Sequence, residues 1–288
     1  MNSAVKTMLD RYSPASADDY ENAIKEIIQE ITLLGMWRAK FFEKAAFYGG
    51  TSLRLLYGLD RFSEGIDFSL LKPDKNFNID HYTRAVRDEL SSFGFAVSVE
   101  RKSKGTDTNI ESAFIKAGTL KNLMIIEAPG SIMNRVSKSK TMKVKIEVDI
   151  DPPPGFETEA KYLLNPIPFS VNTYKLPHLF AGKMHAVLCR DWKTRVKGRD
   201  WYDFIWYIGK NVPLNLNHLE KRLQQTGHVS ANESFTAQTF KELLFERIET
   251  IDFEKTKEDV FPFLKDQAAM NVWSREFFME ISKRIVLE

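Results

Sequence analysis

The spacing of apolar residues changes twice along this chain. In segments 18–36 and 79–93 they recur every three or four positions, as on one face of a helix, and a short further helix is expected over 37–44. Between residues 95 and 151 the period is two, which is typical of β-strands. The helical period returns after residue 177. This order predicts an α+β fold, in which a mixed sheet with helices on one side is followed by an all-helical domain.

The clearest strand is 141–151, TMKVKIEVDID, whose valines and isoleucines point to one side and whose charged residues point to the other. The other strands expected from the pattern are 46–48, 66–70, 95–99, 113–117 and 123–127. The later helices are expected at 178–190, 199–210, 217–226 and 236–249, with weaker ones up to residue 288.

A domain junction is expected between the strands and the later helices. The segment 152–177 holds Pro152–Pro154, Pro166 and Pro168 and has little periodicity. The chain of 288 residues is long enough for two domains, which we place at 1–165 and 166–288.

Composition indicates an ordinary globular protein of the cytoplasm. No apolar run approaches the roughly 20 residues that span a bilayer, and the N-terminal residues have no apolar signal core, so no membrane partner is expected. Cys189 is the single cysteine, which excludes an intrachain disulfide and fits a reducing compartment. Its apolar neighbours predict a small buried residue rather than a nucleophile.

Positive charge is concentrated in two stretches, although the net charge is only +2. Residues 101–145 hold ten lysines and arginines against three acids, and residues 190–199 hold five against one. Such stretches are either solvated surface or a contact for an anionic partner.

The glycine turn after the first strand is the strongest candidate for chemistry. Gly49 and Gly50 lead into a helix that begins with Thr51 and Ser52, and the first turn of a helix presents backbone N–H groups that suit a phosphate. Asp67 lies on the polar face of the next strand, where a carboxylate suits the metal that accompanies a nucleotide. Taken alone, Asp67 could equally be a surface ion-pair partner.

Three acids share the polar face of strand 141–151. Glu147, Asp149 and Asp151 repel one another unless a positive charge lies between them. That charge is either a divalent metal, bound together with Asp67, or Lys145 in a salt-bridged face.

The helical half offers a lysine and two aspartates. Lys183 lies at the edge of an apolar stripe, where it either extends to water or binds a triphosphate. Asp200 and Asp203 open a later helix, as acids favoured by the helix dipole or as parts of a site, and an Arg199–Asp203 pair is the simplest structural interpretation.

Taken together, these motifs resemble the AbiEii/AbiGii family of nucleotidyltransferase-like toxins, which belong to bacterial type IV toxin–antitoxin and abortive-infection systems. The resemblance covers about residues 40–210. The matching motifs, in chain order, are GGTSLR at 49–54, RFSE at 61–64, IDFS at 66–69, KIE at 145–147, KMHA at 183–186 and RDxxD at 199–203.

The resemblance implies a polymerase-β-like nucleotidyltransferase domain, a helical domain, and Mg²⁺-dependent use of an NTP. Its implied acceptor is RNA, the 3′ end of tRNA, and its implied effect is a block of translation. A cognate antitoxin is implied as a partner, which need not bind the toxin directly. The implied nucleotide-binding residues are Gly49, Gly50, Thr51, Ser52, Arg61 and Ser63. The implied catalytic residues are Asp67, Glu147, Lys183, Asp200 and Asp203, and the metal ligands are Asp67 and Glu147, with Asp149 as a further candidate.

One position departs from the family pattern. The family usually carries an aspartate two residues before Asp67, where this chain has Gly65. Catalysis could be weakened, compensated by Glu64 or Asp149, or lost through an introduced change. An NTP:RNA nucleotidyltransferase toxin is therefore the leading hypothesis. A nucleotide- or RNA-binding protein without turnover is the alternative, and transfer to a protein hydroxyl or an aminoglycoside is a third.

Overall fold

The computed structural model describes residues 2–101, 119–127, 141–190, 197–264 and 268–288. The chain forms two compact units. The first comprises Met1–Gly58, Phe62–Pro152 and Thr158–Thr173, and the second comprises Leu59–Arg61, Pro153–Glu157 and Tyr174–Glu288. The chain therefore passes from one unit to the other five times, in place of the single cut expected after residue 165.

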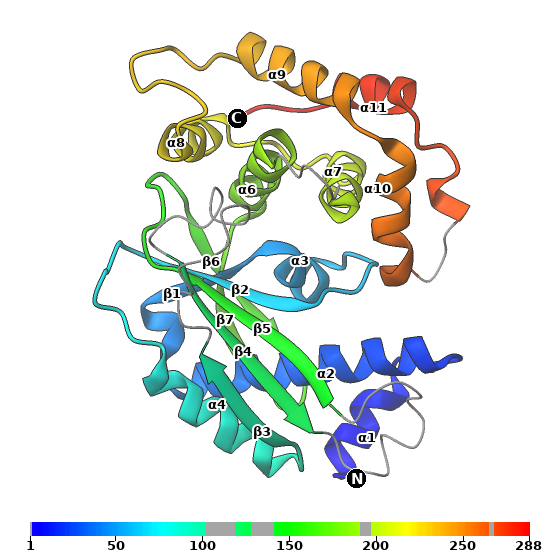
Figure 1. Ribbon diagram of the computed structural model, residues 1–288. Coiled ribbons are helices and arrows are strands. Elements are labelled where there is room, and N and C mark those ends of the chain that lie inside the picture. The colour runs from blue at the N-terminus through cyan, green and yellow to red at the C-terminus, as the bar shows by residue number, and fades with distance from the viewer. Residues whose placement is uncertain (1, 102–118, 128–140, 191–196, 265–267) are drawn as a thin grey trace. The chain divides into compact units, whose positions relative to one another are not determined.

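The first unit is built on a seven-stranded mixed sheet with the order β3-β4-β5-β2-β1-β7-β6 (Figure 1). In it β2 is antiparallel to β1 and parallel to β5, and β1 is parallel to β7. The strands are β1 (Ala45–Tyr48), β2 (Gly65–Leu70), β3 (Ala96–Arg101), β4 (Thr119–Glu127), β5 (Thr141–Asp149), β6 (Thr158–Leu163) and β7 (Phe169–Tyr174).

Among the described residues of this unit, four helices accompany the sheet: α1 (Ser3–Asp10), α2 (Ala17–Arg38), α3 (Gly49–Tyr57) and α4 (Asp80–Ser92). Ser16 and Asp19 form a capping box that starts α2. The isoleucines of α2 are buried in one core with the apolar faces of β2 and β5. This packing leaves the polar faces of those two strands available for a site.

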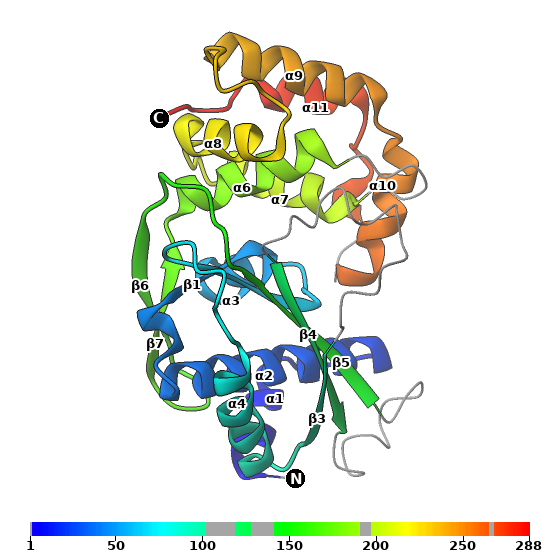
Figure 2. The ribbon, with the colours of Figure 1, turned by 60° about the vertical axis from the view of Figure 1, so that its left-hand side comes forward.

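Helices α2 and α4 lie close together (Figure 2) because Gly35 has no side chain. A Cβ at Gly35 would lie 2.9 Å from the Cα of Val86 on α4, which is closer than packed atoms approach. The small residue thus sets the distance between the two helices.

The structure departs from the expected elements in two places. The helix expected over 37–44 is wrong: α2 ends at Arg38, Lys40 is left-handed with φ of 60°, and a 3₁₀ turn follows at Phe41–Glu43. Strands β6 and β7 were not expected, because prolines obscure their alternation. The strand expected at 113–117 lies outside the described residues.

The second unit is helical. Its helices are α6 (Leu176–Cys189), α7 (Gly198–Gly209), α8 (Leu216–Thr226), α9 (Ala237–Thr250), α10 (Phe253–Val260) and α11 (Arg275–Ser282), with 3₁₀ turns at Phe261–Phe263 and Ala268–Met270. Cys189 is buried, as expected, and burial raises the pKa of its thiol to about 12. The α+β class is confirmed by the mixed sheet and these helices. No helix in the described ranges is both long and apolar enough to cross a membrane.

The two ends of α7 provide a test of how α7 packs against α10. A Cβ at Gly198 would lie 1.8 Å from the Thr256 carbonyl oxygen on α10, whereas a Cβ at Gly209 would meet nothing within 4 Å. We expect Gly198→Ala to lower the free energy of unfolding by about 1–3 kcal/mol or more. Gly209→Ala should be neutral or slightly stabilising. Urea denaturation of both variants measures the difference, and equal stabilities would show that α7 and α10 are not packed in this way.

Candidate active site

The turn from β1 into α3 has no room for a side chain at its first position. Gly49 has φ of +83°, a left-handed conformation that favours glycine. A Cβ at Gly49 would also lie 2.5 Å from Oδ2 of Asp67 and 3.2 Å from its Cγ. The Asp67 carboxylate thus lies against the start of α3, where the positive end of the helix favours a negative charge.

The hydroxyls of Thr51 and Ser52 are buried and hold the loop that precedes β2. The Thr51 hydroxyl hydrogen-bonds to the carbonyl of Gly65 and lies 2.8 Å from Oγ of Ser63. The Ser52 hydroxyl donates to the Gly49 carbonyl at 2.8 Å, and Gln29 donates to the Ser63 carbonyl at 2.9 Å. Both hydroxyls and Ser63 therefore shape the turn, and the helix start can offer a phosphate the backbone N–H groups of its first turn, which begins at Gly49 and Gly50.

The parallel register of β2 and β5 brings two carboxylates side by side. Asp67 is the direct partner of Glu147 in the register, so the two side chains leave the sheet on the same face. Both are partly exposed. The Lys145 ammonium lies 2.9 Å from Oε1 of Glu147, so the salt bridge expected on this face is present.

This donor set fits the metal that the sequence motifs imply. Mg²⁺ prefers oxygen ligands and in nucleotide sites takes one or two carboxylates with phosphates and water. Asp67 and Glu147 supply two such carboxylates from adjacent strands. Lys145 occupies one Glu147 oxygen and would have to give it up when a cation enters.

Gly65 and Asp149 lie on opposite sides of Asp67 along the sheet. Gly65 pairs with Lys145 and Asp149 pairs with Ser69, so the two positions are about 13 Å apart along the strands. Oδ1 of Asp149 also accepts the N–H of Asp151 at 3.1 Å. Glu64 is exposed in a bend directly before β2. Glu64 is therefore the acid next to the Gly65 position, whereas Asp149 stands beyond Asp67.

The remaining site candidates form one buried ion network in the second unit. Nε and Nη2 of Arg61 each donate to one oxygen of Asp203 at 2.6 Å. The Lys183 ammonium lies 2.7 Å from Asp200 and 2.8 Å from Asp203. Nη1 of Arg190 donates to the second oxygen of Asp200 at 2.6 Å. Charges thus alternate in sign from one end of the network to the other.

These contacts explain the protonation of the network. Burial alone would raise the pKa of each aspartate, but the adjacent cations outweigh it. Arg61 and Lys183 lower the pKa of Asp203, and Arg190 and Lys183 lower that of Asp200 far below the usual range. Burial, followed by repulsion from Arg190, lowers the pKa of the nearby Lys197 to about 8.

One sequence interpretation of this region is wrong. Asp203 pairs with Arg61, 142 positions away, and not with the neighbouring Arg199 in a simple surface pair. Nε of Arg199 lies 3.9 Å from Asp259, and its guanidinium stacks 4.1 Å from the centre of the Phe263 ring. Arg190 was missed altogether as a site residue; it directly follows α6, seven positions after Lys183.

Comparison with known proteins decides the family. The family model described as nucleotidyl transferase AbiEii toxin, type IV toxin–antitoxin system, matches residues 31–280. The chain belongs to this family. The recognition made from the motifs is thereby confirmed, and the family implies a cognate antitoxin as partner. No curated protein matches the chain.

Two solved structures resemble this AbiEii-family chain. A protein from H. pylori described as a candidate nucleotidyltransferase has 17% sequence identity, covers 89% of this chain and 94% of its own, and superposes with a TM-score of 0.44. The protein JHP933 from Helicobacter pylori has 17% identity, covers 91% and 94% of the two chains, and has a TM-score of 0.45.

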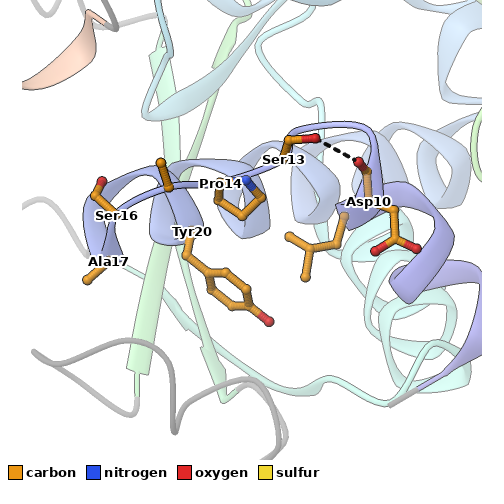
Figure 3. Close-up of a pocket in the computed structure, with 8 residues that line it drawn as sticks. Asp10, Ser13, Pro14, Ser16, Ala17 and Tyr20 are labelled. Carbon is orange, nitrogen blue, oxygen red and sulfur yellow. Dashed lines mark hydrogen bonds between the residues drawn. The ribbon is translucent and has the colours of Figure 1, made fainter.

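The first unit of this AbiEii-family protein also carries a pocket away from the carboxylate pair. It has a volume of about 460 Å³ and lies at the turn between α1 and α2 (Figure 3). Its lining comprises Leu9, Asp10, Ser13, Pro14, Ala15, Ser16, Ala17 and Tyr20. None of the site residues predicted from the sequence lines it.

The contact between Gly49 and Asp67 can be measured with a matched pair of variants. Gly49 and Gly58 flank α3, and both have positive φ, but a Cβ at Gly58 would meet nothing within 4 Å. Both alanine variants carry the same kind of backbone strain, and only Gly49→Ala adds the clash with Asp67. We expect Gly49→Ala to cost at least about 1 kcal/mol more in unfolding free energy than Gly58→Ala. Denaturant titration tests this, and equal costs would mean that Asp67 does not contact the turn.

The buried network predicts a second contrast. Asp203→Asn leaves Arg61 and Lys183 without their shared anion and should lower the unfolding free energy by about 3–5 kcal/mol. Asp60→Asn is the control, because Asp60 is exposed and, among the described residues, accepts a hydrogen bond from Tyr202 rather than forming an ion pair.

The pH dependence has a definite sign. The folded pKa of Asp203 is lowered from 3.8, so its stabilisation is complete above about pH 4 and is lost as the pH falls towards the folded value. The difference in stability between wild type and Asp203→Asn should therefore be constant from pH 5 to about 7 and should shrink below pH 4. If Asp203→Asn and Asp60→Asn lowered the free energy of unfolding by the same small amount, the buried network would be contradicted.

Proposed function

We propose that this protein transfers the nucleoside monophosphate of an NTP to the 3′-hydroxyl of an RNA acceptor, the 3′ end of tRNA, and so blocks translation. The observation that carries the proposal is the carboxylate pair in the first unit. Asp67 and Glu147 are neighbours across β2 and β5, and Asp67 lies directly against the start of α3. A phosphate on the helix start and a cation on the carboxylates would thus share one small region.

Each group has a separate task in this proposal. The N–H groups at Gly49 and Gly50 bind phosphate oxygens of the NTP. Asp67 and Glu147 would hold Mg²⁺, which when bound would supply positive charge to the triphosphate and lower the pKa of the attacking hydroxyl. The attacking 3′-oxygen forms a bond to the α-phosphorus as the bond to pyrophosphate breaks, and its proton passes to a carboxylate, Asp67 or Glu147. Lys145, displaced from Glu147, is then available to pair with a phosphate.

Within the second unit, the implied site residues Lys183, Asp200 and Asp203 are held together with Arg61. Their mutual ion pairs fix each side chain, because every charge is held by at least one partner at 2.6–2.8 Å. Lys183 is the member that can offer its positive charge to a phosphate, and Asp200 and Asp203 orient it. Arg61 then acts by positioning Asp203 rather than by binding the nucleotide directly.

An RNA acceptor is favoured by the two basic stretches of the sequence. Residues 101–145 carry ten lysines and arginines, a density suited to phosphate contacts that do not read sequence. Residues 190–199 carry five, of which Arg190 is paired with Asp200 and Arg199 is buried. Most of these positions lie outside the described residues. Binding through them should weaken steeply as the salt concentration rises.

A second function, binding of nucleotide or RNA without turnover, is favoured by Gly65. Gly65 lies two residues before Asp67 on the same face of β2. A further carboxylate at this position would face the same cation. An aspartate there requires the backbone of β5 to move by a few tenths of an ångström, because a Cβ at Gly65 would lie 3.1 Å from the Lys145 carbonyl oxygen.

The two functions make different predictions for nucleotide transfer. Wild type, Asp67→Asn, Gly65→Asp and the exposed control Asp88→Asn are incubated with labelled NTPs, Mg²⁺ and total tRNA. Loss of the Asp67 carboxylate should slow transfer about a hundredfold or more, because several kcal/mol of charge stabilisation are removed. Asp88→Asn should match wild type, and Gly65→Asp should raise the rate.

Absence of label transfer by both wild type and Gly65→Asp would overturn the transferase proposal. Calorimetry with NTP and Mg²⁺ then tests the second function. Binding without transfer supports it, and absence of binding excludes a nucleotide-binding function. Transfer that appears only in Gly65→Asp identifies the natural chain as a binding protein with a latent catalytic site.

A further inference from the structure

Three potential metal ligands converge in the second unit, apart from the residues used above. His185, Cys189 and His228 each place one ligand atom within 4.8 Å of the others. His185 and Cys189 are four positions apart on α6, so they lie on one face of the helix, one turn after the other. His228 follows Gly227, which ends α8 in a left-handed conformation.

A threonine hydroxyl orients both histidines. Oγ1 of Thr226 lies 3.0 Å from Nε2 of His185 and 2.8 Å from Nδ1 of His228. The single proton of this hydroxyl is directed to the backbone carbonyls of Arg222 and Leu223 on α8. Thr226 therefore accepts from both rings, which places the ring protons on Nε2 of His185 and Nδ1 of His228. The lone pairs are then on Nδ1 of His185 and Nε2 of His228, the arrangement found when a second-shell oxygen orients metal-binding histidines.

The burial of the three groups suits capture of an ion from solvent. His185 and Cys189 are buried, with exposed fractions of 8% and 4%, and His228 is exposed. Two ligands are thus fixed on α6, and the third is on the solvent side. In a tetrahedral zinc site the ligand atoms are about 3.5 Å apart, so the three atoms would have to close by about 1 Å, a movement that the exposed His228 can supply.

We propose that His185, Cys189 and His228 bind one divalent cation of the zinc class and so fasten the end of α8 to α6. Two imidazoles and a thiolate are ligands for Zn²⁺ or Co²⁺, whereas Mg²⁺ prefers oxygen. The thiol transfers its proton to solvent as the metal–sulfur bond forms. Three protein ligands leave the fourth position to water.

This site is separate from the proposed transferase chemistry. Lys183 and His185 differ by two positions, which is about 200° around a helix, so they point to opposite sides of α6. The carboxylates proposed to bind Mg²⁺ belong to the first unit. Zinc-class binding can therefore exist whether or not the chain transfers nucleotides.

Cobalt titration of the untagged full chain tests the proposal. One equivalent of Co²⁺ should produce the visible absorption of a tetrahedral ion and a thiolate charge-transfer band, and Zn²⁺ but not excess Mg²⁺ should displace it. His228→Gln and Cys189→Ser should abolish the charge-transfer band. Thr226→Val should weaken binding about 10- to 100-fold, because the histidines lose their orienting oxygen.

His81→Gln and Asp88→Asn are the controls and should bind Co²⁺ as wild type does, since His81 and Asp88 are exposed and both lie in the first unit. Cys189 is buried and its variant could fail to fold, so exposed His228 provides the independent test. Wild type without a charge-transfer band, or a band that persists in His228→Gln, would overturn the proposal. A rise in melting temperature with Zn²⁺ that disappears in His228→Gln would support it by a second measurement.

Discussion

The contact of the Asp67 carboxylate with the start of α3 is the constraint around which the first unit is arranged. The carboxylate takes the space that a side chain at residue 49 would need, so the turn must be glycine and must be left-handed. The buried hydroxyls of Thr51 and Ser52 then hold the turn and the loop before β2 in place from the inside. The parallel register with β5 adds Glu147 beside Asp67. Two carboxylates side by side repel each other, which is a poor arrangement for stability alone and a good one for binding a cation.

The second unit solves a different electrostatic problem. Five charged side chains, Arg61, Lys183, Arg190, Asp200 and Asp203, are brought together, and all are buried or largely so. The alternation of sign offsets the free-energy cost of removing these charges from water. A well-packed apolar cluster in the same place would stabilise the unit at least as well. Such a network is therefore better explained by a need for fixed orientation than by a need for stability, which is consistent with a role of Lys183 towards a phosphate.

The sequence was informative where local chemistry determines structure. The period of apolar residues located α2, α4 and β5, and the glycine turn followed by Asp67 located the carboxylate site and its family. It failed where the decisive partner is remote. Nothing near Asp203 in the sequence points to Arg61, and the neighbouring Arg199 was the obvious but incorrect partner. Strands β6 and β7 were hidden because prolines interrupt the segment and the pairing of β7 with distant β1 stabilises it.

The repeated passage of the chain between its two units limits how the protein can be divided. A chain shortened to residues 1–165 would lose β7, the neighbour of both β1 and β6, and so expose the edge of the strand that leads into Gly49. It would also leave the guanidinium of Arg61 without the carboxylate that holds it. Only Phe62 separates Arg61 from the loop that Thr51 and Gln29 fasten in the first unit. Division of the chain after residue 165 therefore removes contacts from both units at once, because the sheet loses a strand and Arg61 loses Asp203.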